Sequence, residues 1–126
     1  MSASIEGLAK AEAATGKPSL HGFRLLSSLS LTRDEYDLPY PSYTLTLTVD
    51  TEHRSSNLRL RLRFTKVSNL KLGELGSGHI QIIGLNIIDI SDRQWESFRF
   101  EVEDYEDQRI HFFCWNAEVL DVTPLD

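Results

Sequence analysis

The ten residues NLRLRLRFTK, Asn57 to Lys66, decide the fold class of this chain. Apolar and polar residues alternate along them without a break: Leu58, Leu60, Leu62 and Phe64 against Arg59, Arg61, Arg63 and Thr65. A period of two places the two sets on opposite faces of an extended strand. The stretch therefore predicts a β-strand with a buried leucine face and a solvated arginine face.

The segment before this strand predicts its hairpin partner. Residues 43–49, YTLTLTV, alternate in the same way, and the polar residues 50–56 join the two stretches. An antiparallel hairpin is the economical connection, and it would set the threonines opposite the arginines on a polar outer face. We expect acidic residues on neighbouring strands to neutralise the arginines.

Further stretches predict the rest of a mainly β fold. They are residues 22–32, in which Leu26 breaks the alternation, and residues 80–90, 98–103, 110–115 and 118–122. Residues 80–90 are apolar on both parities around Gly84, which predicts a bulged strand covered on both faces. The cover could be an N-terminal helix, a second sheet or a second subunit.

These patterns together predict an antiparallel, strongly curved sheet or a two-layer β-sandwich of about six to seven strands. Residues 3–15 have helical composition and stop before Gly16 and Pro18, which predicts one short N-terminal helix. The 126 residues suffice for one hydrophobic core. We therefore expect a single domain, with residues 1–20 as a helical arm and residues 22–122 as the β domain.

The composition of the chain indicates the cellular compartment in which the protein works. No apolar run approaches the roughly 18 residues of a membrane span, and the N-terminus lacks the basic start and apolar block of a secretory signal. Cys114 is the only cysteine, which excludes an intrachain disulfide. The expectation is a cytoplasmic protein that does not contact a membrane.

The net charge of −6 is distributed unevenly along the chain. Residues 1–66 carry nine Lys and Arg against seven Asp and Glu, a sum of +2, while residues 67–126 carry four against twelve, a sum of −8. The only basic run is the arginine face of one strand, so we expect no nucleic-acid binding. The acidic half favours a partner with a basic surface.

Residues that could support catalysis or hold a metal form no recognisable set. Cys114 and His111 are three residues apart on one predicted strand and so lie on opposite faces. The four histidines show neither His-x-His nor HExxH spacing, and there is no cysteine cluster. We therefore expect no enzyme activity, no metal site and no cofactor.

An acidic turn and a tyrosine-containing loop supply the candidate binding residues. The acidic turn follows the predicted strand at 98–103, and the tyrosines lie in the loop at 33–42. Tyrosines beside carboxylates suit a recognition surface, although such rings can also fold onto the edge of a core. The predicted binding residues are Tyr36, Tyr40, Glu103, Asp104, Tyr105, Glu106 and Asp107.

The C-terminal third resembles a known group of proteins. The run from Gly84 to Val122, GLNIIDISDRQWESFRFEVEDYEDQRIHFFCWNAEVLDV, is similar to the end of small uncharacterised bacterial proteins, some of which resemble immunity proteins that neutralise toxins of neighbouring cells. The matching pattern is an apolar strand, the DISDRQWE turn, F-x-F-x-V, an acidic turn with a tyrosine, and I-x-F-x-C. The resemblance implies a non-catalytic protein-binding module whose partner is a toxin, and the acidic half of the chain suggests that the toxin's site is basic.

Two other roles stay open on the residues alone. A pocket on the concave side of the sheet could bind a small ligand through His79, His111, Trp115 and the arginine row. Alternatively, Phe113 and Trp115, on the outward parity of residues 110–115, could join two copies of the chain as a homodimer.

Overall fold

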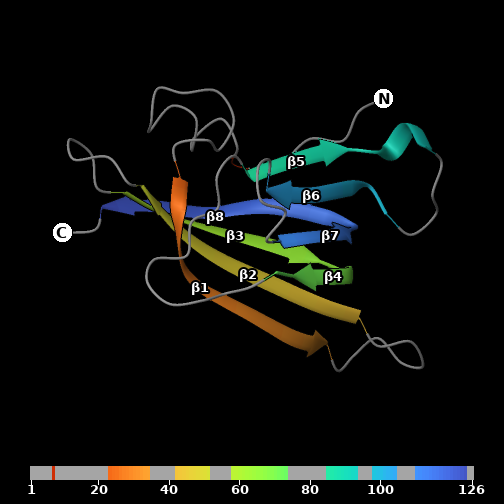
Figure 1. Ribbon diagram of the computed structural model, residues 1–126, viewed down its shortest axis with the longest axis horizontal. Helices are drawn as coiled ribbons and strands as arrows, with labels where there is room; N and C mark the ends of the chain where they lie inside the picture. Colours follow the sequence, from red (N-terminus) through yellow and green to blue (C-terminus); the bar gives the residue numbers. More distant parts are fainter. Residues whose placement is uncertain are drawn as a thin grey trace.

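The computed structural model describes residues 7, 23–34, 42–51, 58–73, 85–93, 98–104 and 110–124. Within them the chain forms strands and one short 3-10 helix (Figure 1): β1 (Phe23–Asp34), β2 (Ser42–Thr51), β3 (Leu58–Thr65), β4 (Ser68–Leu72), β5 (Leu85–Asp89), η1 (Ser91–Arg93), β6 (Phe100–Asp104), β7 (Ile110–Cys114) and β8 (Asn116–Pro124). These residues include no α-helix and no helix long and apolar enough to cross a membrane. Apart from Gly7, the predicted N-terminal helix at 3–15 lies outside them.

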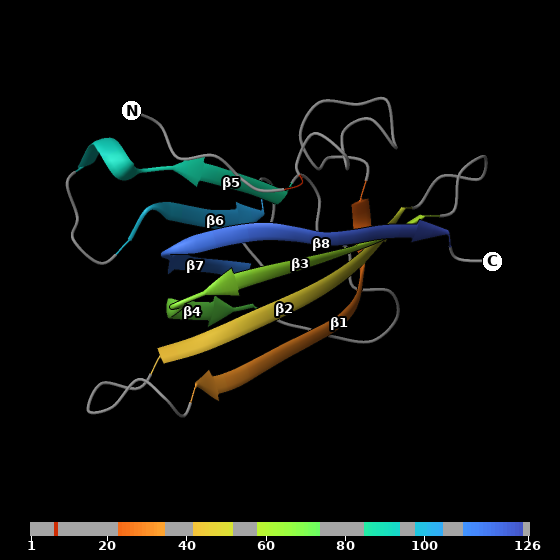
Figure 2. The ribbon, with the colours of Figure 1, turned by 180° about the vertical axis from the view of Figure 1, so that it is seen from behind.

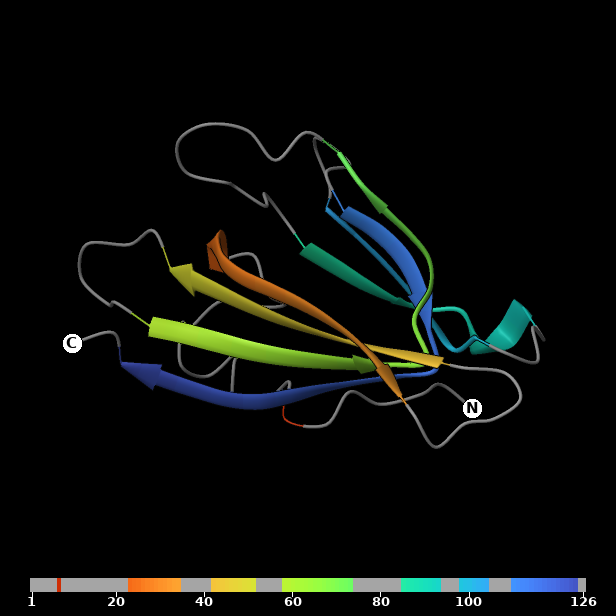
Figure 3. The ribbon, with the colours of Figure 1, turned by 90° about the horizontal axis from the view of Figure 1, so that it is seen from below.

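The strands form two antiparallel sheets of four strands each. The first sheet has the order β1-β2-β3-β8, and its strands lie side by side in one layer (Figure 2). The second has the order β4-β7-β6-β5. Figure 3 shows the two sheets as layers that diverge from a common corner. The architecture is thus the two-layer alternative, and its eight strands correct the expected six to seven.

Two strands pass from one sheet to the other at this corner. β3 leads through Lys66 and Val67 into β4, and β7 leads through Trp115 into β8. The backbone N–H of Trp115 donates to the carbonyl oxygen of Thr65 over 3.0 Å, and Lys66 bends the chain with a positive φ of 52°. The sheets therefore share one bent pair of strands, as sandwiches do where strands switch sheets.

The hydrophobic core lies between the two sheets. Leucines and the phenylalanine of β3 cover it from the first sheet, and alternate residues of β6 and β7 cover it from the second. Phe64 and Phe112 meet across the layers, with ring centroids 4.9 Å apart and ring planes at 75°. The predicted inward faces are confirmed at Leu45, Leu47 and Val49 of β2 and at Leu60, Leu62 and Phe64 of β3. Tyr43 was expected on the same inward face, but it is 39% exposed.

A bulge in β1 explains why Leu26 breaks the alternation. Leu26 pairs with Val49 and Leu29 pairs with Leu47, so three steps along β1 match two steps along β2. The extra residue, Ser27, shifts the parity, so that Leu26 and Leu29 both pack against the core.

β4 is the strand that the sequence pattern did not predict. Its pairing with β7 changes register between Ser68 and Lys71, and Asn69 between them has a positive φ of 56°. Such an irregularity removes the two-residue period, because residues before and after it change faces. The sequence of this segment therefore lacks the pattern of a strand, although the segment forms an edge strand of the second sheet.

Candidate functional site

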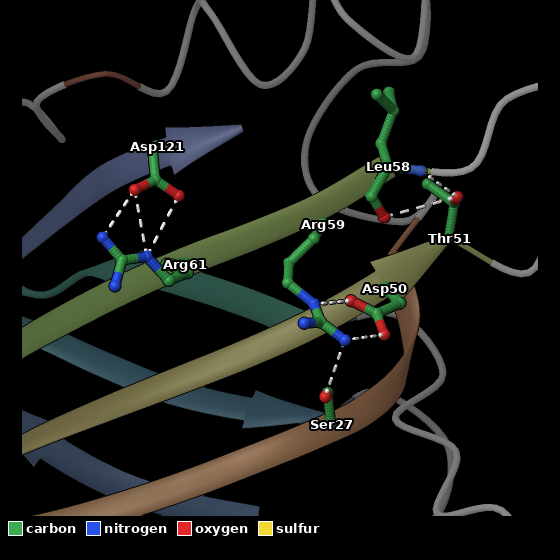
Figure 4. Close-up of polar contacts among 7 residues, drawn as sticks. All are labelled: Ser27, Asp50, Thr51, Leu58, Arg59, Arg61 and Asp121. Carbon is green, nitrogen blue, oxygen red and sulfur yellow. Dashed lines mark hydrogen bonds and ion pairs between the residues drawn. The ribbon is translucent and has the colours of Figure 1, made fainter. Parts of the chain in front are cut away.

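The arginines of β3 lie on the outer face of the first sheet. Arg59 donates from Nε to Asp50 of β2 over 2.9 Å and from a terminal nitrogen to Ser27 of β1 over 3.1 Å (Figure 4). Arg61 donates to Asp121 of β8, with the shortest contact at 2.6 Å. Hydrogen bonds to these carboxylates, together with their charge, raise the pKa of both guanidinium groups.

The third arginine completes a neutralised face. Arg63 pairs with Glu118 of β8, so each of the three arginines meets its own carboxylate. Thr46 and Thr48 stand opposite Arg63 and Arg61 in the strand register. The predicted threonine–arginine pairing and the predicted neutralisation are both confirmed. A basic surface for a nucleic acid needs cations without such partners.

The outer face of the second sheet carries a polar cluster of three side chains. His111 of β7 lies beside Glu101 of β6, with Nε2 2.8 Å from a carboxylate oxygen. Glu103 of β6 is the direct register partner of His111. One ligand-type atom from each side chain lies within 4.8 Å of the other two. Two carboxylates and an imidazole thus meet on neighbouring strands.

Aromatic rings continue this face toward the corner. Phe113 lies between His111 and Phe98, with ring centroids at 5.2 and 5.5 Å. Trp115 is 39% exposed, and the guanidinium carbon of Arg99 lies 5.4 Å from its ring centroid. Tryptophan and arginine are the residue types most enriched at the energetic centres of protein interfaces. We call Glu101, Glu103, His111, Phe113 and Trp115 the acidic-aromatic face.

Asp104 lies inside the protein, whereas the sequence assigned it to the acidic binding turn. Its side chain is 1% exposed, and Oδ1 accepts a hydrogen bond from the backbone N–H of Ile110 over 3.0 Å. Oδ2 has no hydrogen-bond partner in the described part of the chain. The reason is parity, since Phe100, Val102 and Asp104 alternate toward the core. Asp104 therefore ties the end of β6 to the start of β7.

We expect Asp104→Ala to lower the free energy of unfolding by about 1–3 kcal/mol, because the buried N–H of Ile110 would lose its acceptor. Asp104→Asn keeps an acceptor oxygen and should cost less. Urea unfolding of both variants measures the difference. If Asp104→Ala kept full stability but bound a partner more weakly, the carboxylate would belong to a binding surface after all.

The other predicted binding residues divide into two groups. Glu103 lies on the acidic-aromatic face. The rest lie outside the described residues: Tyr36, Tyr40, Tyr105, Glu106 and Asp107. Sequence reasoning did not select Glu101, and it considered His111 only for a ligand pocket, although the outward parity of their strands was a usable signal. What it lacked was the register that brings the two strands together.

Cys114 faces the core, and its thiol is protected. Burial raises the pKa of this thiol to about 12. His111, three residues earlier, lies on the outer face beside Glu101. The prediction that the two side chains lie on opposite faces is confirmed, so they form no nucleophile–base pair.

We expect Cys114 to resist alkylation in the folded protein. With a pKa of about 12, roughly one thiol in ten thousand is ionised at about pH 8. Iodoacetamide followed by mass spectrometry should label the chain only in denaturant. In the unfolded chain the Cys114 thiol has an ordinary pKa near 9. The free energy of unfolding should therefore fall as the pH rises from about 9 toward 12, because only the unfolded chain loses this proton there. Rapid labelling of the native chain would contradict the buried position.

The residues considered for a ligand pocket do not come together. The arginine row lies on the outer face of the first sheet, His111 and Trp115 lie on the outer face of the second, and His79 lies outside the described residues. A hollow of about 360 Å³ instead lies beside the edge strands β1 and β4. Its lining residues are Leu31, Tyr43, Val67, Ser68, Asn69 and Leu70.

The fold and its outer faces define an antiparallel β-sandwich domain with one neutralised face and one acidic and aromatic face. The chain matches the family model described as Immunity protein PIM8 over residues 17–119, and it belongs to this family of immunity proteins. The match spans strands of both sheets and confirms the resemblance noted in the C-terminal third. A search of curated proteins and a search of solved structures each found no match.

Proposed function

We propose that the protein is a non-catalytic inhibitor that protects its cell by binding a toxin. The family match over residues 17–119 carries this proposal, because it supports a protein-binding role of the toxin-inhibitor type. The buried, protonated Cys114 agrees with it, since this thiol offers no nucleophile at the surface.

We propose the acidic-aromatic face as the toxin-binding surface. Residues 67–115 carry nine Asp and Glu against four Lys and Arg, a sum of −5. The arginines and carboxylates of the first sheet's outer face cancel one another. Charge that is not cancelled locally is what attracts and orients a partner of opposite sign.

The partner surface that suits this face is basic, with an apolar pocket for an aromatic ring. Glu103 makes no ion pair with another described residue, so its carboxylate can meet a lysine or arginine of the toxin. Trp115 adds a large exposed ring just beyond the end of β7. Glu106 and Asp107 follow Glu103 closely along the sequence and add further negative charge to this part of the chain.

The first experiment tests inhibition. A candidate toxin taken from the neighbouring genes is expressed with and without this chain, and growth is measured. We expect the chain to restore growth and to form a complex with the purified toxin. Continued growth arrest, together with no complex by gel filtration, would contradict the proposed function.

The second experiment tests the surface. We expect the toxin affinity to fall as salt rises and to fall in Glu103→Gln, because both changes remove attraction between charges. Glu118→Gln is the matched control, since it makes the same change on the opposite sheet beside Arg63. If the toxin affinity did not change with salt or in Glu103→Gln but fell in Glu118→Gln, the binding surface would instead be the outer face of the first sheet.

The exposure of Trp115 also supports a second proposal, a homodimer joined through Phe113 and Trp115. Sedimentation velocity distinguishes the two states. A monomer at all accessible concentrations would remove the homodimer and leave this aromatic surface available to the toxin.

A further inference from the structure

We propose that Glu101, Glu103 and His111 form a binding site for a divalent transition metal ion such as Zn²⁺. Each residue supplies one ligand atom, and the three atoms lie within 4.8 Å of one another. Imidazole nitrogen and carboxylate oxygen are both ligands of Zn²⁺, and three protein ligands are the usual number in sites that keep one coordination position open. This site shares its residues with the acidic-aromatic face, but its test does not depend on whether the protein binds a toxin.

The sheet holds these three side chains in place. β6 and β7 are the inner strands of the second sheet, flanked by β5 and β4. Glu103 is paired with His111 in the register, and Glu101 lies two residues along on the same face. The side chains of His111 and Glu101 are only 24% and 17% exposed, so neighbouring atoms restrict their motion. Ligands on rigid strands lose little freedom when an ion binds.

The distance between two of the three ligand atoms requires a small adjustment. Tetrahedral ligands about 2.0–2.1 Å from Zn²⁺ are about 3.3 Å from one another. The Nε2 of His111 and the carboxylate oxygen of Glu101, now 2.8 Å apart, would open by about half an ångström. The metal then replaces the proton between them, which moves to Nδ1 or to solvent.

Lys71 gives this proposal a second, opposite test. Lys71 of β4 is the register partner of His111 on its other side, and its side chain is exposed. A fixed positive charge near the ligands opposes the entry of a cation. Lys71→Gln should therefore bind Zn²⁺ a few times more tightly, whereas loss of a ligand should weaken binding.

The sequence predicted no metal site because these residues lack the spacing of known motifs within one element. The ligands come instead from two strands, β6 and β7, and only the register of one against the other brings them together. A histidine opposite a glutamate on paired strands is a different arrangement from the helical HExxH pattern.

The experiment titrates the untagged, chelator-treated full-length chain with ZnCl₂ by isothermal calorimetry, and with CoCl₂ followed by visible absorption. We expect saturation at one ion per chain, and a melting temperature that rises with zinc concentration. Glu103→Gln and His111→Gln should each weaken binding at least tenfold. Asp92→Asn is the matched control, because it removes an exposed negative charge that lies in the same acidic half of the sequence but outside the cluster. This variant should leave the zinc affinity unchanged.

Several results would overturn the site. They are the absence of saturable binding at millimolar zinc, equal affinity in Glu103→Gln and the parent chain, and loss of binding when His21, His53 and His79 are changed to glutamine instead. Should His111→Gln fail to fold, Glu103→Gln and Lys71→Gln still decide the question. Neither titration involves the toxin, so a negative result would leave the proposed inhibition untouched.

Discussion

Phe64→Ala should lower the free energy of unfolding by about 3–5 kcal/mol, the largest effect on stability that we expect from a single substitution. Phe64 is fully buried, and its ring meets Phe112 of the opposite sheet. β3 is hydrogen-bonded to β2 on one side and to β8 on the other, so the strand cannot move in to fill the cavity. Urea unfolding followed by circular dichroism measures the loss.

Two comparisons sharpen this test. Phe112→Ala and the double variant complete a cycle, and we expect a coupling of about 0.5–1.5 kcal/mol between the two rings. Leu31→Ala removes an apolar side chain that is 45% exposed, so its cost should be far smaller. Equal losses in Phe64→Ala and Leu31→Ala would contradict a core shared by the two sheets.

Trp115→Ala should weaken toxin binding by about 2 kcal/mol or more, which is roughly 30-fold in affinity. The expectation rests on the proposed binding surface, in which the indole is the largest exposed ring. Arg99 lies 5.4 Å from the centre of this ring and holds it at the surface. Calorimetry with the purified toxin measures the change.

Tyr43→Ala is the matched control for Trp115→Ala. Tyr43 is also 39% exposed, but it lines the hollow beside β1 and β4. Its loss should leave the toxin affinity within about twofold, since residues outside the energetic centre of an interface contribute little. A larger effect at Tyr43 than at Trp115 would indicate that the toxin binds at that edge. Melting temperatures of both variants separate binding from folding.

Alternation along single strands could be predicted from the sequence because it depends only on local backbone geometry. The inward leucines of β3, the threonines opposite its arginines and the opposite faces of Cys114 and His111 all follow from it. The inward position of Asp104 was readable too, since it shares parity with Phe100 and Val102. Its acidity led the sequence analysis to place it in solvent.

Pairing between distant strands could not be predicted in this way. Arg61 lies 60 residues from Asp121, and no local signal selects β8 as the neighbour of β3. The cluster of Glu101, Glu103 and His111 likewise needs the register of β6 against β7, which the pattern within either strand does not specify. β4 was missed for a different reason, because its irregular pairing hides the period that marks a strand.

The corner at which β3 becomes β4 and β7 becomes β8 should govern how the protein opens. Because the segments β3–β4 and β7–β8 each run through both sheets, neither sheet can unfold while the other stays folded. Deuterium should therefore enter the amides of β3 and β7 at one shared, slow rate, whereas the outermost strands β1 and β5 exchange sooner by fraying. The molecule would then open as one cooperative unit rather than as two halves.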